Sequence, residues 1–190
     1  LARTGVGNLR LIDGDRFDGS NLNRQIFSDE TTLARDKVAV ARERLQRVNS
    51  SINVEAVAER LTAENGAELL AGSDAVADCL DSISARFVLQ NVAGAADMPL
   101  VSAAVAGRNG QLLTIRPGDA GLRAVYGEPD AAPERGVEVE LGNLPFTVSL
   151  LSSLQCAELV RILLGQEELC RNRLLLVDLS DGTFESVTLT

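Results

Sequence analysis

The sequence predicts an α/β protein with a Rossmann-like, doubly wound and mostly parallel sheet that ends in antiparallel strands. Three observations predict this class. Short apolar runs alternate with segments of helical period over residues 9–105, as is typical of parallel strands covered by helices. After residue 105 that alternation stops, and an apolar helix and a turn-linked strand pair follow. We expect a single domain over residues 1–190, because a chain of this length buries about 70% of its unfolded surface.

The elements of the parallel part follow from the spacing of their apolar residues. The opening residues resemble the last turn of a helix, which Gly5 and Gly7 would end. Residues 14–35 show little periodicity and are predicted to be irregular. In chain order we expect strands at 9–13, 54–58, 74–79 and 99–105, and helices at 36–48, 63–70 and 82–95.

The last part of the chain has a different pattern. A strand is expected at 111–115, followed by a crossover loop at 117–145 that holds four of the five prolines. Residues 147–164 form a strongly apolar helical segment. Two strands, at 173–177 and 184–189, are joined by a turn and predict an antiparallel hairpin.

The composition excludes several classes of protein. The chain has no histidine, so a Ser-His-Asp triad, a Cys-His pair and a His-ligated metal are excluded. A net charge of -9 disfavours nucleic-acid binding. We recognise no signal peptide and no apolar run of about 18 residues, and therefore expect no membrane partner.

The three cysteines are odd in number and far apart, without C-x-x-C spacing, which indicates a cytoplasmic protein without zinc. Cys79 is expected in a core strand and Cys156 on an apolar helix face, both as inert packing. Cys170 is expected to be exposed.

Two acidic residues occupy positions where parallel sheets bind ligands. Asp13 ends the first strand, and Asp81 follows the strand at 74–79 and opens the next helix. Ligands of such sheets bind beyond the carboxyl ends of the strands. Each acid also has a simpler interpretation, Asp13 as a turn residue and Asp81 as a helix N-cap. Spacing alone favours neither.

Further motifs follow these acids in a fixed order. Residues 11–15 (LIDGD) and 20–25 (SNLNRQ) are followed by Lys37, the only lysine, and by Arg47-Val48-Asn49. Later matches are 78–82 (DCLDS) with Arg86, 99–102 (PLVS) and 153–158 (SLQCAE). This ordered series, which covers nearly the whole chain, closely resembles the ThiF/MoeB/HesA adenylyltransferases, relatives of ubiquitin-activating enzymes.

The resemblance implies a reaction and its partners. It implies ATP- and Mg2+-dependent adenylation of the C-terminal glycine carboxylate of a ubiquitin-like sulfur-carrier protein of the ThiS or MoaD type, which ends in Gly-Gly, with release of pyrophosphate. It also implies a homodimer. A catalytically silent relative that binds a carrier protein or regulates an active subunit is the alternative. A nicotinamide-dependent oxidoreductase rests on fold analogy alone.

The resemblance also implies a set of site residues. The catalytic residues are Arg24, Lys37 and Asp81, with Asp81 as the Mg2+ ligand. The ATP-binding residues are Asp13, Asp15, Asn21, Arg24, Gln25, Lys37 and Leu80. These types suit the task, because a carboxylate accepts bonds from ribose hydroxyls, cations neutralise phosphates and a carboxylate oxygen suits Mg2+. The simpler alternatives are a surface ion pair for Arg24 and a solvated first-turn side chain for Lys37.

The chain departs from the family pattern at three places. The family's Gly-rich phosphate loop is expected before Leu1, so that βα unit is largely missing from this sequence. The loop at 117–145 has no cysteine to receive the acyl group, and the paired cysteines that bind zinc in many relatives are absent. Ser82 stands where asparagine is usual. We therefore expect adenylation without a transfer cysteine on this chain and without zinc.

Overall fold

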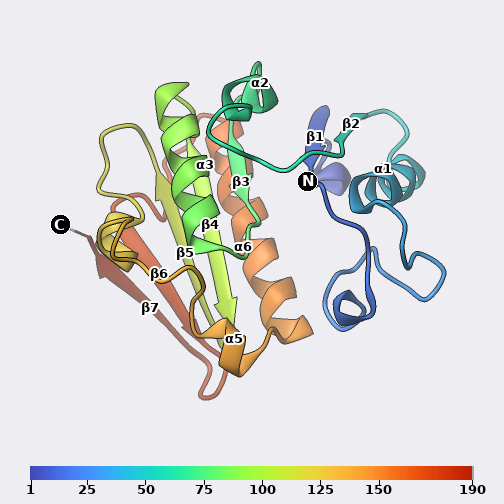
Figure 1. The fold of residues 1–190 in the computed structure, drawn as a ribbon. Helices are drawn as coiled ribbons and strands as arrows, with labels where there is room; N and C mark the ends of the chain where they lie inside the picture. Colours follow the sequence, from blue (N-terminus) through green and yellow to red (C-terminus); the bar gives the residue numbers. More distant parts are fainter. Residues whose placement is uncertain (190) are drawn as a thin grey trace. The chain divides into compact units, whose positions relative to one another are not determined.

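The computed structural model describes residues 1–189 and confirms the α/β class (Figure 1). The chain divides into two compact units, Leu1–Leu61 and the part that begins at Thr62, and each is described by itself. The single domain expected over the whole chain stays a prediction.

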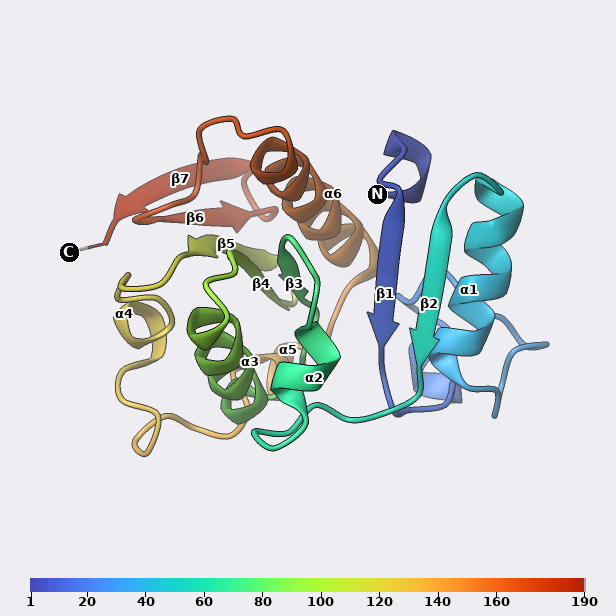
Figure 2. The same ribbon diagram turned by 90° about the horizontal axis from the view of Figure 1, so that it is seen from above.

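The first unit is a small parallel βαβ arrangement. Its elements in order are η1 (Ala2–Thr4), β1 (Asn8–Ile12), η2 (Gly19–Asn21), α1 (Lys37–Val48) and β2 (Asn53–Val57). Strands β1 and β2 pair in parallel from Asn8 opposite Asn53 to Ile12 opposite Val57, and α1 packs along them (Figure 2). The core consists of buried Ala2, Ile52 and Val54 with Leu9, Leu11 and Leu45 packed against it. The sheet and helix expected here are confirmed, and η1 ends at Gly5 as predicted.

The second unit is built on a five-stranded sheet in the order β3-β4-β5-β6-β7. Its strands are β3 (Val76–Asp78), β4 (Leu100–Ala106), β5 (Asn109–Ile115), β6 (Arg173–Asp178) and β7 (Thr183–Thr188). Strands β3 and β4 are parallel, with Asp78 opposite Ser102, and every later pair is antiparallel. The antiparallel part therefore begins at β4 and is larger than the C-terminal hairpin that the sequence indicates.

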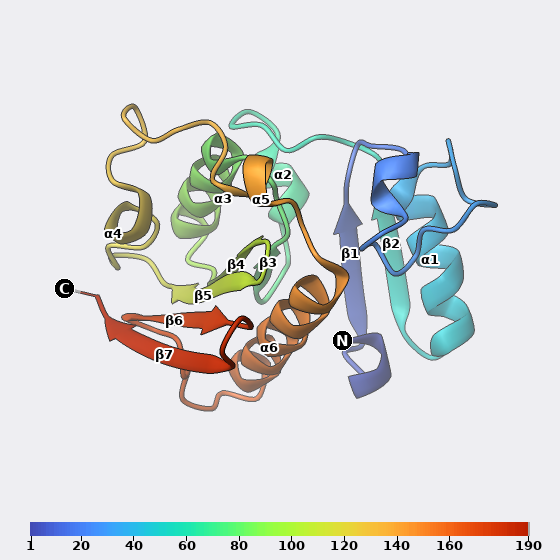
Figure 3. The ribbon, with the colours of Figure 1, turned by 90° about the horizontal axis from the view of Figure 1, so that it is seen from below.

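This unit has helices on both faces of its sheet. They are α2 (Gly66–Leu70), α3 (Ile83–Ala95), α4 (Arg123–Tyr126), α5 (Glu138–Leu141) and α6 (Pro145–Leu163). Of these, α3, α5 and α6 contact the strands. Helix α3 lies on one face and α6 on the other (Figures 2 and 3). The segment 117–145 is not a continuous loop as predicted, because it contains the two short helices α4 and α5.

Helix α6 lies directly on β4 and β5. Its buried face includes Leu151 and two polar residues, Gln155 and Glu158. By length and composition alone α6 is apolar enough to cross a membrane, which corrects the expectation that the sequence holds no such run. The core helix of a soluble domain passes the same test. The hydrogen bonds from Gln155 and Glu158 to the sheet and its loops attach one face of α6 to this unit, in which 28% of the apolar window of the helix is buried.

Candidate functional site

The first predicted acids follow the carboxyl end of β1. The Asp13 N–H donates to the Val57 carbonyl (3.1 Å), and the Asp15 N–H donates to Asp13 Oδ1 (2.8 Å). Gly14 is required between them, because a Cβ at this position would lie 2.8 Å from Arg60 Cγ and 3.1 Å from the Arg60 nitrogen. The tight turn therefore places both carboxylates at one end of the β1–β2 pair.

Lys37 completes a cluster with these two carboxylates. It is the first residue of α1, and its N–H donates to the Asp15 carbonyl (3.0 Å). Its Nζ lies 3.2 Å from Asp15 Oδ2 and 3.6 Å from Asp13 Oδ2, and Arg60 Nη2 lies 2.5 Å from Asp15 Oδ1. The Lys37 side chain is only 16% exposed, so the interpretation of Lys37 as a solvated first-turn residue is wrong. The structure brings together Asp13, Asp15 and Lys37, as well as Arg60, which was not predicted as a site residue.

The polar turn that contains Asn21, Arg24 and Gln25 is held by its own side chains. Buried Asn21 accepts from the Asp18 N–H through Oδ1 (3.2 Å), and the Asp18 carboxylate accepts from the Ser20 N–H, which forms a capping box around η2. Hydrogen bonds from the Ser20 hydroxyl and N–H lower the pKa of Asp18. The Gln25 N–H donates to the Asn21 carbonyl (2.9 Å).

Arg24 also makes its contacts within this turn. Its Nη1 donates to the Ser20 carbonyl (2.8 Å) and to Asn23 Oδ1 (3.1 Å). The interpretation of Arg24 as an ion-pair partner is not supported, since both acceptors are neutral. A guanidinium held by two neutral acceptors keeps its charge available for an anion such as a phosphate.

In the second unit, Asp81 lies between β3 and α3. Its side chain is 75% exposed, and Oδ2 lies 3.6 Å from Arg135 Nη2. The N-cap of α3 is Ser82, whose Oγ accepts from the Ala85 N–H (3.3 Å). The alternative interpretation of Asp81 as the helix cap is therefore wrong, and Ser82 performs that role at the position where the family has asparagine.

A buried polar network that the predicted site did not include lies directly before Asp81. The Asp78 carboxylate is fully buried. Its Oδ2 accepts hydrogen bonds from Arg86 Nη1 (2.9 Å) and Ser102 Oγ (2.5 Å). Its Oδ1 accepts from the Leu80 N–H (2.9 Å). Arg86 Nη2 also donates to the Leu80 carbonyl. Gln155 Nε2 donates to the carbonyls of Asp78 and Val101, at 2.8 Å each.

Burial dominates the electrostatics of this network. It raises the pKa of Asp78, while Arg86 and the hydrogen bonds from Ser102 and Leu80 act in the opposite direction. An acid inside an apolar strand, followed eight residues later by an arginine, is the sequence signal that could have identified the pair. Leu80, which was predicted to bind ATP, takes part in this network through its backbone N–H and carbonyl groups.

The donor set fits Mg2+ bound together with a nucleotide. Among residues 1–189, no group of three or more His, Cys, Asp or Glu side chains is arranged to hold a metal ion. Mg2+ commonly uses one or two protein carboxylates and takes its remaining oxygens from substrate phosphates and water. The exposed Asp81 carboxylate of the second unit fits this mode. In the first unit, which is described by itself, Lys37 and Arg24 are cations of the kind that bind phosphate groups.

Two of the three expectations about the cysteines are wrong. Cys79 lies just after the end of β3 and is exposed, and Cys170, which we expected at the surface, is buried. Burial, with the nearby Glu158 carboxylate, raises the pKa of the Cys170 thiol to about 11. Cys156 is half-buried on α6. The apolar residues next to each cysteine in the sequence did not show which cysteines are buried and which are exposed.

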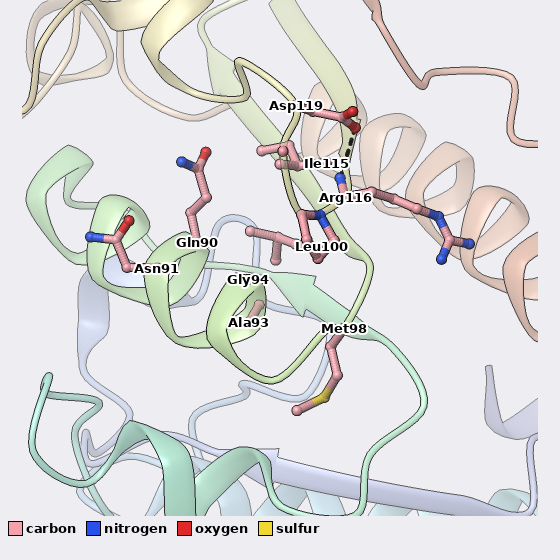
Figure 4. A pocket seen from close by; sticks show the side chains of 11 residues that line it. Gln90, Asn91, Ala93, Gly94, Met98, Leu100, Ile115, Arg116 and Asp119 are labelled. Carbon is pink, nitrogen blue, oxygen red and sulfur yellow. Dashed lines mark hydrogen bonds between the residues drawn. The ribbon is translucent and has the colours of Figure 1, made fainter.

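One cavity of the second unit is lined by residues other than Asp81. It has a volume of about 200 Å³ and is lined by residues from the last turns of α3, the start of β4 and the end of β5, including Gln90, Asn91, Met98 and Leu100 (Figure 4). The Arg116 N–H donates to Asp119 Oδ2 (2.9 Å) at its rim. None of the predicted site residues lines this cavity.

Comparison with known proteins identifies a sequence family. The family model described as the ThiF family matches residues 1–190. The SAMP-activating enzyme E1 of Haloferax volcanii is 34% identical over 190 residues, which cover 98% of this chain and 69% of that enzyme. The sulfur carrier protein adenylyltransferase of Thermus thermophilus is 32% identical over 197 residues, which cover 99% of this chain and 72% of that enzyme.

Comparison with solved structures supports the fold. A crystal structure of Escherichia coli MccB with succinimide superposes with a TM-score of 0.80 at 16% identity, over 99% of this chain. The chain spans 57% of the length of MccB, so it corresponds to a part of that longer protein.

Proposed function

This chain belongs to the ThiF family, and from that premise we propose that it catalyses adenylation of the C-terminal glycine carboxylate of a ubiquitin-like sulfur-carrier protein. The observation that carries the proposal is the likeness to enzymes named for this class of reaction over almost the whole chain. The cluster of Lys37 with Asp13 and Asp15, which joins motifs that are far apart in sequence, supports it.

In the proposed reaction, a carboxylate oxygen of the carrier attacks the α-phosphorus of ATP. The carboxylate–phosphorus bond forms as the bond to the pyrophosphate oxygen breaks, so an acyl-adenylate and pyrophosphate result. The attacking group is already ionised at neutral pH and needs no general base. A chain without histidine is therefore suited to this chemistry.

Each site residue has a role that follows from its surroundings. Lys37 and Arg24 neutralise phosphate charge, and Asp13 accepts hydrogen bonds from the ribose hydroxyls. Asp15 and Asn21 would also contact the nucleotide, and they hold the elements that carry these groups, through the Lys37 N–H and the capping box. The roles of Gln25 and Leu80 as nucleotide contacts belong to the same proposal.

Mg2+ belongs to this proposal as well, with the exposed carboxylate of Asp81 as its ligand. When bound, the ion would neutralise phosphate charge and orient the leaving pyrophosphate. A cytoplasmic homodimer and a carrier ending in Gly-Gly complete the proposal. Analytical ultracentrifugation of the natural full-length protein tests the dimer.

ATP–pyrophosphate exchange tests the reaction. We expect carrier proteins with a Gly-Gly terminus to stimulate exchange by the natural full-length protein, and a carrier without the terminal glycine to fail. Lys37→Ala and Asp81→Ala should each lower the rate by roughly 10²-fold or more, the scale for losing a transition-state charge contact. Arg42→Ala, which removes an exposed cation from the same helix as Lys37, is the matched control.

One outcome would contradict the proposed reaction, and another would contradict only its residue assignment. If no carrier stimulates exchange, the chain is better explained as a silent relative that binds a carrier protein. If carriers stimulate exchange but both alanine variants retain it, the reaction stands and the assignment of Lys37 and Asp81 is wrong.

A further inference from the structure

Side chains from both faces of the sheet hold the segment that leaves β3. The Leu80 N–H donates to Asp78 Oδ1 (2.9 Å), and the Leu80 carbonyl accepts from Arg86 of α3. From the opposite face, Gln155 of α6 donates to the Asp78 carbonyl (2.8 Å). The paired register of β3 with β4 ends at Asp78, so beyond that residue side chains fix the backbone.

Arg86 is the centre of this arrangement. Its Nη1 reaches Asp78 Oδ2 (2.9 Å) and the Ala103 carbonyl (2.8 Å), while Nη2 is bonded to the Leu80 carbonyl. A planar guanidinium can satisfy these separate acceptors together, and the compact ammonium group of a lysine cannot. The arginine thus connects the end of β3, the loop after it and β4.

A gain in stability is a weak explanation for the buried ion pair of Asp78 and Arg86. The side chains of Asp78 and Arg86 are 0% and 8% exposed, and a buried ion pair often contributes no more than apolar residues of similar volume. Specifying one geometry is the better-attested use of buried charges. The geometry specified here is that of the segment leading to Asp81.

The Asp81 side chain has little to hold it in place. It is 75% exposed, and the guanidinium with which it pairs, that of Arg135, is at 3.6 Å and is itself 59% exposed. Its position therefore depends on the backbone to either side, where the Asp78–Leu80 segment precedes it and the Ser82 cap of α3 follows it.

We propose that Arg86, Asp78 and Gln155 are positioning residues that set the location of the Asp81 carboxylate, an inference that rests on the proposed Mg2+ role of Asp81. Mg2+ demands near-ideal octahedral geometry. Residues that orient a metal ligand typically change metal affinity by about 10- to 100-fold when they are replaced. The three residues act through Asp81 and need not touch the nucleotide.

The test uses Arg86→Lys in the natural full-length protein, with Mn2+ as the probe ion. Titration of Mn2+ in the presence of ATP, followed by electron paramagnetic resonance, should give an affinity about 10-fold weaker than that of the wild type. Exchange activity should show a raised requirement for Mg2+ and a rate near that of the wild type at saturating Mg2+. Amide hydrogen exchange at Leu80 should become faster, because its acceptor is no longer fixed.

Two further variants complete the design. Arg116→Lys is the matched control, since Arg116 also forms a partly buried ion pair in this unit, with Glu168; its metal affinity should equal that of the wild type. Gln155→Met keeps the side-chain length and removes both donated hydrogen bonds, and it should weaken Mn2+ binding as well. If Arg86→Lys does not fold, the Mn2+ affinity of Gln155→Met tests the inference in its place.

The inference is overturned if folded Arg86→Lys or Gln155→Met binds Mn2+ with wild-type affinity. It is also overturned if the control loses affinity equally, because the effect would then follow from general destabilisation. Asp81→Ala distinguishes a failure of the proposed Mg2+ role of Asp81 from a failure of the positioning inference alone. If that variant keeps wild-type Mn2+ affinity, the proposed role of Asp81 is wrong and the positioning inference falls with it.

Discussion

Replacing Gly110 with alanine would place a methyl group in space that Leu151 occupies. A Cβ on Gly110 of β5 would lie 2.3 Å from Leu151 Cδ2 and 2.6 Å from Cγ. Leu151 is 1% exposed on α6, so its side chain has no open space to enter. Overpacking of this kind costs about 1–3 kcal/mol, and we expect Gly110→Ala to reduce the free energy of unfolding by that amount.

The reverse change removes volume at the same contact. Leu151→Ala should cost about 2–5 kcal/mol through lost burial and a residual cavity. In the double variant Gly110→Ala/Leu151→Ala, the added methyl group enters the space that the leucine leaves. The double variant should therefore lose less unfolding free energy than the sum of the losses in the two single variants, by about 1–3 kcal/mol.

Urea unfolding followed by far-ultraviolet circular dichroism measures these values, since the chain has no tryptophan and only one tyrosine. With a slope of about 2 kcal/mol/M, a loss of about 2 kcal/mol lowers the midpoint by about 1 M. Gly94→Ala is the control, because a Cβ there meets nothing within 4 Å in helix α3. It should stabilise by about 0.5–1 kcal/mol. Strict additivity in the double variant would refute the packing argument.

Three further predictions concern ionisable groups. Asp78→Asn should cost about 3–5 kcal/mol of unfolding free energy in urea titrations, because it leaves a buried guanidinium without its carboxylate; a loss below about 1 kcal/mol would contradict this. With its pKa raised to about 11, buried Cys170 should resist iodoacetamide at pH 8 while exposed Cys79 reacts, as peptide mass spectrometry can determine; equal rates would show this wrong. Asp18 has a pKa lowered below 3.8 by Ser20, so its contribution to stability is present above that pH and is lost as the pH falls through the lowered pKa. An NMR titration with a midpoint at or above 3.8 would disprove the last point.

The sequence predicted those parts of the fold that depend on local patterns. Helix α1 runs from Lys37 to Val48, within one residue of the range expected from the period of its apolar side chains. The β1 and β2 strands were predicted for the same reason. The antiparallel pairing of β5 with β6 was not predicted, because it joins segments that are far apart in sequence. The β4–β5 hairpin was missed although its pairing is local, across Gly107 and Arg108.

The site shows the same division between local and distant information. Asp13, Asp15 and Lys37 were identified from ordered motifs, and the structure places them within one cluster. The contact of Gln155 with the Asp78 carbonyl joins residues 77 positions apart, for which no spacing rule exists. Burial of the cysteines was mispredicted because it depends on tertiary packing, which the neighbouring residues in sequence do not report.

Cys79 is an exposed residue whose Sγ lies 4.0 Å from Gln155 Oε1, and it offers an experimental opportunity. It is located between Asp78 and Leu80, in the segment whose geometry we propose to matter for metal binding, whereas Cys170 is buried. A spin label or fluorophore attached there would report on this backbone segment in the protein without an introduced cysteine. Within residues 1–190, replacing Cys156 by serine would confine the reporter to Cys79, since Cys170 is buried, and movement of the segment could be followed in solution.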